Sequence, residues 1–387
     1  MRKTLGPILS ALLLLALPAT SASADPASVS LSASASKIEV GDSVTLSGTI
    51  SSPTAGERVE ILDDADVVIA TATTDAAGAF GADLTPEATT AYRALWAGVA
   101  SDPVTVAVRA SVTVRLGPVR LFDQATVRGR VRPAVSGAKA LVTLSLGGTA
   151  VETVPARLGP GGAFSADFAV EHPGTYRARA TFSDADHLAG GAVSVARRTP
   201  LPSLHEGSSA VFVELLERRL VELHYRLEGL DRRYDSRTGD AVVAFRKVQG
   251  MRRVFTVDAA TWRALADPVV PTARSRDDGF HIEVNQTRQV LYTVQDGEIT
   301  NILHISSGKP STPTHDGNFR VARKIAGFSP NHLYYPSYFD GNRALHGWTE
   351  VPTYAASHGC VRIPYWNAKF IYGVAKIGTP VIVYHSR

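Results

Sequence analysis

Residues 345–363 read LHGWTEVPTYAASHGCVRI and contain Cys360, the only cysteine in a chain of 387 residues. Two histidines, His346 and His358, lie in this stretch, and each is followed directly by a glycine. A cysteine with histidine close by is a candidate nucleophile and base, because the thiolate attacks and an imidazole can generate it. A free cysteine can also be a small buried apolar side chain. The polar residues around Cys360 favour a reactive thiol, since such thiols occupy electropositive, partly exposed sites.

The N-terminus has the three parts of a secretory signal. Arg2 and Lys3 are basic, residues 8–17 are apolar, and residues 22–24 form a small-x-small cleavage site. An apolar segment of this length, flanked in this way, is too short to span a bilayer. We therefore expect residues 1–24 to be a signal peptide and the mature protein to be exported, without a lipid anchor because no cysteine follows the signal. An exported chain with one thiol cannot form an internal disulfide, which again favours a reactive cysteine.

Composition and charge narrow the class of protein only slightly. The chain is 44% hydrophobic and 20% charged, as ordinary globular proteins are. The formal net charge of +4 is mild, and no dense run of lysine and arginine indicates a nucleic-acid partner. At roughly 100–200 residues per domain, the length predicts two to four domains.

The first half of the chain contains a repeat. GAFGADL at residues 78–84 returns as GAFSADF at residues 162–168, and TAYRA at residues 90–94 returns as GTYRA at residues 174–178. A fixed offset between two such pairs indicates a tandem duplication. Short alternating runs separated by Gly, Pro, Ser and Asp predict that each copy is a β-sandwich.

We expect these two modules at residues 27–109 and 110–198. They resemble exported bacterial immunoglobulin-like modules, without the cysteines that join the two sheets. Neither copy contains a cluster of chemically reactive residues, so they are interpreted as spacers or as weak binding modules.

A helical segment follows an expected linker at residues 199–208. Apolar residues then recur with helical spacing, and TGDAVVAFRK at residues 238–247 is followed by TWRAL at residues 261–265. In this order, residues 209–267 resemble the small three-helix peptidoglycan-binding domain found beside many wall enzymes.

This copy departs from the family pattern at Glu217 and Arg246, where glutamine is usual. Wall binding and a purely positional role therefore both stay open for this domain. A second linker is expected at residues 268–278, which contain two prolines.

The C-terminal segment, residues 279–387, returns to β character. Its period-two and apolar runs predict a mostly β domain with one or two short helices. The expected strands are residues 281–285, 289–294, 299–306 and 380–385, and a helix is expected near residues 366–375.

This segment resembles the catalytic domain of L,D-transpeptidases, the YkuD-like fold. The matching motifs are IEV at 282–284, QVLY at 289–292, SGK at 307–309, PTHDGNF at 313–319, HG at 346–347, SHGCVR at 357–362 and GTPV at 378–381. Two departures exist: the Thr-Pro turn is longer than usual, and Arg362 stands where some members have asparagine.

The resemblance implies a chemistry for Cys360. Members of the family build 3→3 crosslinks in bacterial peptidoglycan: the cysteine attacks the carbonyl of the donor stem's third residue, displaces terminal D-alanine and forms a thioester, which an acceptor amine then takes. His346 is the implied base, expected as an imidazolium that holds the thiolate at working pH. Gly347 would leave room for a backbone carbonyl that orients the ring.

His358 competes with His346 for the role of base. It lies two residues from Cys360, so on an extended backbone both side chains would share a face. We assign it second to His346, as a supporting residue. The amides of Gly359 and Cys360 are the candidate oxyanion donors, with Ser357 in support.

Substrate contacts are predicted from charge and aromatic content. Arg362 could pair with a stem carboxylate or form a structural salt bridge. Residues 326–342 are rich in Tyr and Phe, which suggests a lid over the site or a small satellite core. Tyr335, Tyr338 and Gly347 are the candidate substrate contacts in addition to Arg362.

The sequence thus predicts a mainly β, multidomain cell-wall enzyme with a cysteine nucleophile, acting outside the cytoplasm. No cofactor or metal is expected, because the other histidines lack metal-ligand spacing. The expected partners are peptidoglycan stem peptides, with carbapenem β-lactams as covalent inhibitors, and no transmembrane segment is expected in the mature chain. A carboxypeptidase, a protein-to-peptidoglycan ligase and a non-catalytic wall-binding scaffold are the alternatives.

Overall fold

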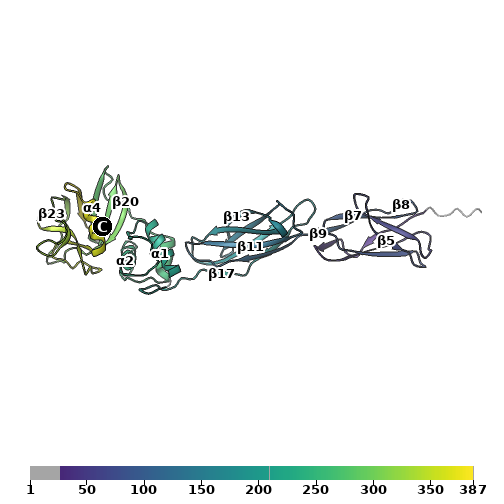
Figure 1. Cartoon of the computed structure of the whole chain (residues 1–387), viewed down its shortest axis with the longest axis horizontal. Helices are drawn as coiled ribbons and strands as arrows, with labels where there is room; N and C mark the ends of the chain where they lie inside the picture. Colours follow the sequence, from purple (N-terminus) through teal and green to yellow (C-terminus); the bar gives the residue numbers. More distant parts are fainter. Residues whose placement is uncertain (1–26, 209, 387) are drawn as a thin grey trace, which may run out of the picture. The chain divides into compact units, whose positions relative to one another are not determined.

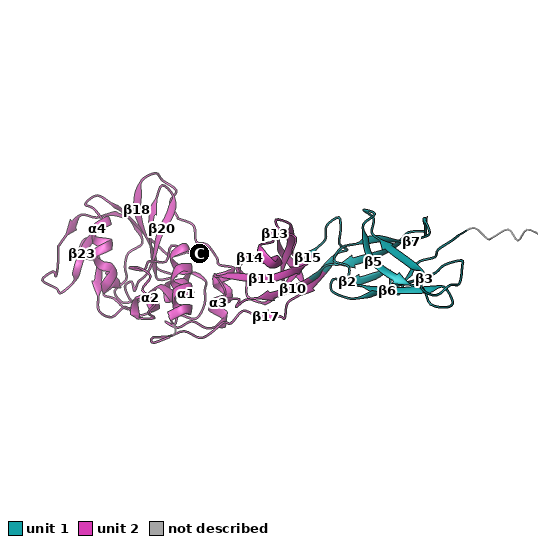
Figure 2. Cartoon of the chain, turned by 45° about the vertical axis from the view of Figure 1, so that its right-hand side comes forward, with its two compact units in different colours: residues 1–111, 182–190 teal, residues 112–181, 191–387 magenta. Residues whose placement is uncertain are grey.

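A computed structural model describes residues 27–208 and 210–386 (Figure 1). The predicted signal peptide falls outside these residues. The mainly β prediction is confirmed, and the described part of the chain has four α-helices. None of these four is long and apolar enough to cross a membrane. The chain divides into two compact units, residues 1–111 with 182–190 and residues 112–181 with 191–387 (Figure 2).

The first unit contains two β-sheets. One has the order β1–β3–β6 and the other the order β2–β9–β7–β4–β5, with β8 paired to β7. Their strands are β1 Ser32–Ala33, β2 Lys37–Glu39, β3 Val44–Thr49, β4 Arg58–Leu62, β5 Val68–Thr73, β6 Ala79–Leu84, β7 Thr90–Trp96, β8 Val99–Ala100 and β9 Val104–Arg109. Leu46 of β3 packs in one buried cluster with Ile61 of β4 and Val106 of β9, so the two sheets share a core.

The second unit begins with a similar pair of sheets, ordered β10–β11–β14 and β13–β12–β15–β16, with β17 paired to β15. Their elements are β10 Ser111–Leu116, β11 Gln124–Arg132, β12 Lys139–Leu146, β13 Thr149–Arg157, the 3-10 turn η1 Pro160–Gly162, β14 Ala163–Ala169, β15 Thr175–Phe182, β16 Gly190–Val193 and β17 Arg197–Arg198. The immunoglobulin-like relationship of these modules stays a prediction.

The repeated motif occupies the same position in both pairs of sheets. Phe80 of β6 faces Gly48 of β3, and Phe164 of β14 faces Gly129 of β11. A Cβ atom at Gly48 would lie 2.6 Å from the Phe80 ring, and one at Gly129 would lie 2.2 Å from the Phe164 ring. In both copies the phenylalanine therefore lies over a position where only glycine leaves room.

Three helices follow: α1 Ala210–Glu222, α2 Ser236–Val248 and α3 Ala259–Ala266. Asp235 caps α2 by accepting from the amides of Arg237 and Thr238. Asp258 and Thr261 form a capping box at the start of α3. These caps satisfy amide groups that a helix leaves unpaired at its N-terminus.

Both predicted linkers are tied to their neighbours by hydrogen bonds. In residues 199–208, Leu204 exchanges backbone hydrogen bonds of 3.0 and 2.9 Å with Val257. In residues 268–278, the amides of Arg274 and Ser275 donate to the Glu283 carboxylate over 3.0 and 2.9 Å. Both segments are therefore ordered connections and not flexible linkers.

The C-terminal domain has two sheets and a short helix. Their orders are β20–β19–β18–β26–β21 and β22–β23–β24–β25. The elements are β18 Phe280–Asn285, β19 Val290–Gln295, β20 Glu298–His304, β21 Gly317–Arg320, β22 Arg323–Lys324, β23 Tyr334–Asp340, β24 Arg343–Trp348, β25 Val361–Pro364, the 3-10 turn η2 Tyr365–Asn367, α4 Ala368–Val374 and β26 Pro380–Tyr384. Ile282 of β18 and Leu345 of β24 lie in one buried cluster between the sheets.

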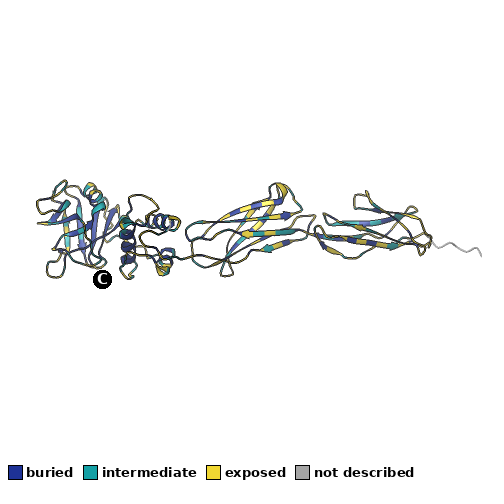
Figure 3. Cartoon of the chain, turned by 60° about the horizontal axis from the view of Figure 1, so that its bottom comes forward, coloured by how far each residue is buried: buried dark blue, intermediate teal, exposed yellow. Residues whose placement is uncertain are grey.

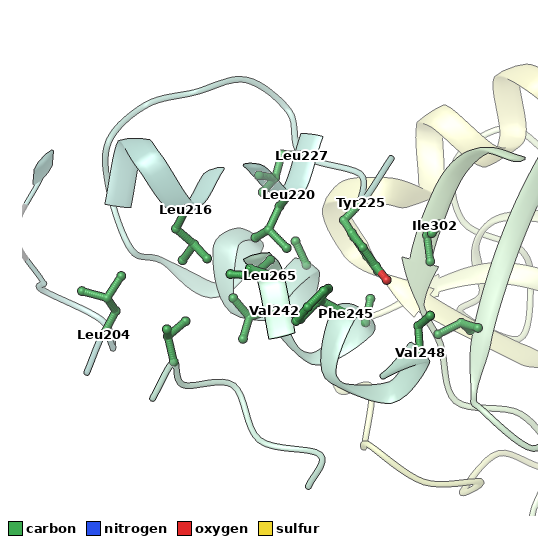
Figure 4. Packing of buried hydrophobic residues seen from close by; sticks show 14 of the residues in the cluster. Leu204, Leu216, Leu220, Tyr225, Leu227, Val242, Phe245, Val248, Leu265 and Ile302 are labelled. Atoms are coloured by element: carbon green, nitrogen blue, oxygen red, sulfur yellow. The ribbon is translucent and has the colours of Figure 1, made fainter. Parts of the chain in front are cut away.

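The three-helix segment and the C-terminal domain share a second core (Figure 4). Phe245 of α2 packs in it with Val290 of β19 and Ile302 of β20. Leu291, the neighbour of Val290, points into the other core. The strand β19 is therefore buried on both faces. Figure 3 shows where buried residues lie along the chain. The burial of β19 explains why residues 290–294 do not alternate between buried apolar and exposed polar side chains.

A lysine of the helical segment crosses this interface. Lys247 of α2 is buried, and its Nζ donates to the carbonyl oxygens of Gln289 and Ile305 over 2.8 and 2.9 Å. It also lies 2.5 Å from Nδ1 of His304, whose Nε2 is 2.9 Å from the carbonyl oxygen of Val351. Burial lowers the pKa of both Lys247 and His304 well below their ordinary values.

Removing the Phe245 side chain tests the shared core. Phe245→Ala should lower the free energy of unfolding by about 3–5 kcal/mol, as truncation of a buried aromatic residue does. Because the core is shared, hydrogen exchange measured by mass spectrometry should accelerate in β19 and β20 as well as in α1–α3. Val221→Ala, at an exposed position of α1, is the control. Acceleration confined to the helices would contradict a shared core.

Candidate active site

The candidate nucleophile lies at the start of a parallel strand pair. In the register of β24 and β25, His346 lies beside Arg362 and Leu345 beside Val361. Leu345 and Val361 point into the core between the sheets, so His346 and Arg362 point to the opposite face.

Cys360, two residues before Arg362, lies at the level of Ala344, because the Ala344 amide is a hydrogen-bond partner of its thiol. This amide favours ionisation of the thiol, whereas burial opposes it. Cys360 itself directly precedes β25, and its Sγ donates over 3.8 Å to the carbonyl oxygen of Asn342, the residue before β24. Ala344 lies two residues before His346 on β24.

His346 is held in a single tautomer. Its side chain is almost wholly buried, and its Nδ1 lies 3.0 Å from the carbonyl oxygen of Gly347. A carbonyl only accepts, so Nδ1 carries the hydrogen and Nε2 keeps its lone pair. A Cβ atom at Gly347 would come within 2.6 Å of the Ala368 Cβ atom, which explains the glycine after the histidine. Nε2 is therefore the atom available as a base.

The directions of the pKa shifts differ from the expected ion pair. Burial lowers the pKa of His346 to about 4, and the positive charge of Arg362 acts in the same direction. Burial raises the pKa of the Cys360 thiol, although the Ala344 amide, Arg343 and Arg362 oppose this. At neutral pH the resting site therefore holds a thiol and a neutral imidazole. These directions favour a neutral pair over the expected thiolate–imidazolium pair, and a neutral His346 suits the role of general base during attack.

The loop before Cys360 is braced from within by Ser357. The Ser357 Oγ donates to the carbonyl oxygen of Cys360 and accepts from the amide of Gly359 over 3.1 Å. Gly359 has a φ of +109°, a conformation that favours glycine. The buried Ser357 hydroxyl thus closes a tight turn that fixes the backbone of the nucleophile.

The same loop is held from outside by a threonine that the sequence analysis missed. The Thr314 Oγ1 donates to the carbonyl oxygen of Gly359 and accepts from the amide of Gly308, both over 2.9 Å. Thr312 donates to the carbonyl oxygen of Ser357 over 3.1 Å. Both threonines lie in or beside the Thr-Pro turn motif, but nothing in the sequence indicates that their hydroxyls reach the cysteine loop.

Only one of the two predicted oxyanion donors is available. The Gly359 amide is engaged by Ser357. The Cys360 amide, in contrast, has no hydrogen-bond acceptor among the residues that the structure describes. The prediction is corrected accordingly: the Cys360 amide is the candidate donor, and Gly359 contributes its backbone conformation.

His358 belongs to the loop before Cys360. The positive φ of Gly359 interrupts the extended backbone that would have placed both side chains on one face. His358 is exposed, and its Nε2 is 3.3 Å from Nζ of Lys309. The Nδ1 atom of His346 is already bound to the carbonyl oxygen of Gly347. His358 therefore does not fix the His346 ring through Nδ1, and its role as an alternative base stays a prediction.

Two arginines flank the thiol and imidazole. Arg362 lies with its Cζ 5.3 Å from the centre of the Trp348 ring and has no ion pair with a carboxylate of the described residues. The alternative of a structural salt bridge is therefore wrong for Arg362. Arg343, which the sequence analysis missed, pairs with Asp340 over 3.2 Å and donates to the carbonyl oxygen of Pro313 over 3.2 Å.

The predicted aromatic contacts lie elsewhere. Tyr338 is only 5% exposed and lies beneath Arg323, so it cannot offer a surface to a ligand. Tyr335 packs on Tyr372 of α4, and α4 approaches β24 at Gly347, on the face opposite to His346. The aromatic segment at residues 326–342 largely forms β23 and a satellite cluster rather than a cover over Cys360.

Comparison with known proteins identifies the domain. Residues 279–383 match the family model of the YkuD L,D-transpeptidase catalytic domain. The C-terminal domain belongs to the L,D-transpeptidase family. No curated protein sequence matches the chain at a significant level.

Several solved L,D-transpeptidases are similar to parts of the chain. The enzyme from Xylanimonas cellulosilytica is 32% identical, with a TM-score of 0.46, and the match spans 48% of this chain and the whole of the Xylanimonas chain. The enzyme from Stackebrandtia nassauensis is 22% identical, with a TM-score of 0.31, and the match spans 49% of this chain and 98% of the Stackebrandtia chain. The Enterococcus faecium catalytic domain acylated by ertapenem is 27% identical, with a TM-score of 0.25, and the match spans 28% of this chain and the whole of the Enterococcus domain.

The protonation state of this L,D-transpeptidase site can be measured directly. Alkylation of Cys360 by iodoacetamide should rise with pH to a midpoint above the usual range of a cysteine, because burial raises the pKa of the thiol. The His346 ring, followed by NMR, should titrate near pH 4, because burial favours its neutral form. A thiol that alkylates at full rate at pH 7, together with a His346 midpoint above 7, would contradict the neutral pair.

Proposed function

We propose that this protein is an exported L,D-transpeptidase that forms 3→3 crosslinks in peptidoglycan through a thioester on Cys360. One observation carries the proposal: within a matched catalytic domain, Cys360 directly precedes β25, which pairs in parallel with β24, and β24 carries His346 with Nδ1 bound to the Gly347 carbonyl and Nε2 left as the base. This arrangement provides a nucleophile and a base in a partly buried site.

In the first half-reaction, Cys360 is acylated by the donor stem. As Sγ attacks the carbonyl carbon of the stem's third residue, His346 Nε2 takes the thiol proton. The Cys360 amide stabilises the oxyanion. The bond to terminal D-alanine then breaks, and the protonated imidazole returns its proton to the departing amine. A histidine that is neutral at rest suits this sequence, because it is ready to accept the first proton.

In the second half-reaction, an amine of the acceptor stem attacks the thioester carbonyl. His346 takes a proton from this amine, the carbon–sulfur bond breaks, and the thiolate is reprotonated by the imidazolium. Arg362 lies beside His346 in the strand register and has no described carboxylate partner. We assign it to a carboxylate of the stem peptide.

The upstream parts of the chain have subsidiary roles in this proposal. Residues 1–24 direct export, the modules at 27–109 and 110–198 act as spacers, and the protein works at the cell wall, where crosslinking contributes to cell shape. The three-helix segment at 209–267 has a positional role, because it shares a core with the catalytic domain.

Product analysis tests this function. Residues 25–387 incubated with purified disaccharide-tetrapeptide should release D-alanine and form a crosslinked dimer, detected by mass spectrometry. Ertapenem should add one drug mass to this protein and none to Cys360→Ala. His346→Ala should fold and lose at least 10²-fold in the rate of acylation, as loss of a general base does. Tripeptide and D-alanine without dimer would indicate hydrolysis, and no release by a folded protein would overturn the proposal.

Replacing the Thr314 hydroxyl by a methyl group tests whether its hydrogen bonds to the cysteine loop support catalysis. Thr314→Val deletes the hydrogen bonds to the backbone of Gly308 and Gly359. Unmade hydrogen bonds of this kind cost about 1–3 kcal/mol, so acylation by ertapenem should slow by about 5- to 150-fold. Thr300→Val, at an exposed position of β20, is the matched control. Equal acylation rates for the two variants would show that the hydrogen bonds of the Thr314 hydroxyl do not contribute to catalysis.

A further inference from the structure

A cleft of about 570 Å³ opens between the helical segment and the catalytic domain. Asp240 of α2 and Phe255 line one side of it. The other side is formed by Trp348 with the loop that follows β24, and by the end of β25 with η2. A volume of this size is typical of ligand sites, which lie preferentially where two domains meet.

The cleft continues the face that carries the reactive residues. Side chains two residues apart on a strand point to the same side. Along this face the parallel pair β24–β25 presents His346 with Arg362, then Trp348 with Pro364, and the ring centres of His346 and Trp348 lie 5.6 Å apart. Cys360 directly precedes β25, at the level of Ala344. Trp348 and Pro364 also line the cleft. The cleft thus begins one row beyond His346, about 13 Å along the strands from the level of Cys360.

We infer that this cleft binds the peptide stem of the acceptor strand. This inference rests on the proposed transpeptidase function and deepens it. In the second half-reaction the acceptor amine has to meet the thioester carbon at Cys360 and hand its proton to His346. The rest of the acceptor stem therefore leaves the reaction centre on the His346 side, and there the cleft is the next surface along the same face.

The walls of the cleft suit a peptide carrying hydrogen-bond donors. Tyr354 is 63% exposed and, with Trp348, offers flat apolar surface at low entropic cost. Glu350 is exposed and supplies a carboxylate acceptor. Asp240 accepts from Trp366 Nε1 over 2.9 Å, and burial raises its pKa to about 6.

The loop that carries these groups is fixed in place by buried or anchored side chains. Nε2 of His304 binds the carbonyl oxygen of Val351 over 2.9 Å. Nη1 of Arg253, from the helical segment, donates to the carbonyl oxygen of Thr353 over 3.0 Å. The site is thus held in shape before the ligand arrives, which lowers the entropic cost of binding. The helical segment contributes to the acceptor site both directly, through Asp240, and by anchoring this loop.

Binding can be measured without catalysis. The probe is a disaccharide-tripeptide stem, which can act as an acceptor but has no terminal D-alanine to lose. The chain has four tryptophans, and two of them, Trp348 and Trp366, line the cleft. In the Cys360→Ala protein the indole NMR signals of these two should shift on titration, whereas those of Trp96 and the core residue Trp262 should not. Unchanged Trp348 and Trp366 signals at millimolar tripeptide would overturn the inference.

Kinetics of the two half-reactions distinguish the acceptor site from the donor site. The double variant Glu350→Gln/Tyr354→Ala should raise the KM for the tripeptide acceptor about tenfold, equivalent to the loss of one good contact. Acylation by the disaccharide-tetrapeptide donor or by ertapenem should change less than twofold. The control is Glu298→Gln/Ile377→Ala, two exposed positions outside the cleft.

The outcomes separate this inference from the proposed function. An unchanged acceptor KM in the cleft variant, or a raised donor KM instead, would overturn the acceptor site while the transpeptidase stands. A wild-type protein that forms no acyl-enzyme would overturn the proposed function. The indole titration would in that case still decide whether the cleft binds the stem peptide.

Discussion

The structure of the catalytic unit depends on one sheet that is buried on both faces. Strands β19 and β20 face the core between the two sheets on one side and the three-helix segment on the other. Lys247 crosses this boundary and ties the ends of β19 and β20 to α2 through two backbone carbonyls and His304. A lysine this deeply buried is costly unless its donors are satisfied, so the two parts have to fold against each other.

The same packing sets the chemistry of the site. Burial disfavours charge, and it acts on His346 and Cys360 in directions that both favour the neutral forms. The site therefore combines a protonated thiol with an imidazole whose tautomer is fixed by the Gly347 carbonyl. Nucleophilicity is created when the substrate is bound and the proton moves, rather than stored as a resting ion pair.

The helical segment links fold to substrate selection. Its α2 helix packs on the sheet, its Asp240 lines the cleft beside Trp348, and its neighbour Arg253 anchors the loop that forms the opposite wall. In this chain a segment that resembles a wall-binding module is built into the catalytic unit. In the proposed function, this segment acts through the cleft wall that it supplies.

The amino-acid sequence was enough to predict the mainly β class, the catalytic domain at the C-terminus and Cys360 as the candidate nucleophile, because alternation and short motifs are local properties. It also predicted the glycine after His346 for a carbonyl that orients the ring. Only the tertiary structure decided the rest. The positive φ of Gly359 interrupts the extended backbone between His358 and Cys360, Thr314 reaches the cysteine loop from a distant turn, and packing of α2 on β19 and β20 joins the helical segment to the catalytic domain through one core. These features depend on contacts between residues far apart in the chain and on how deeply such contacts bury ionisable groups. A local sequence pattern predicts neither of these.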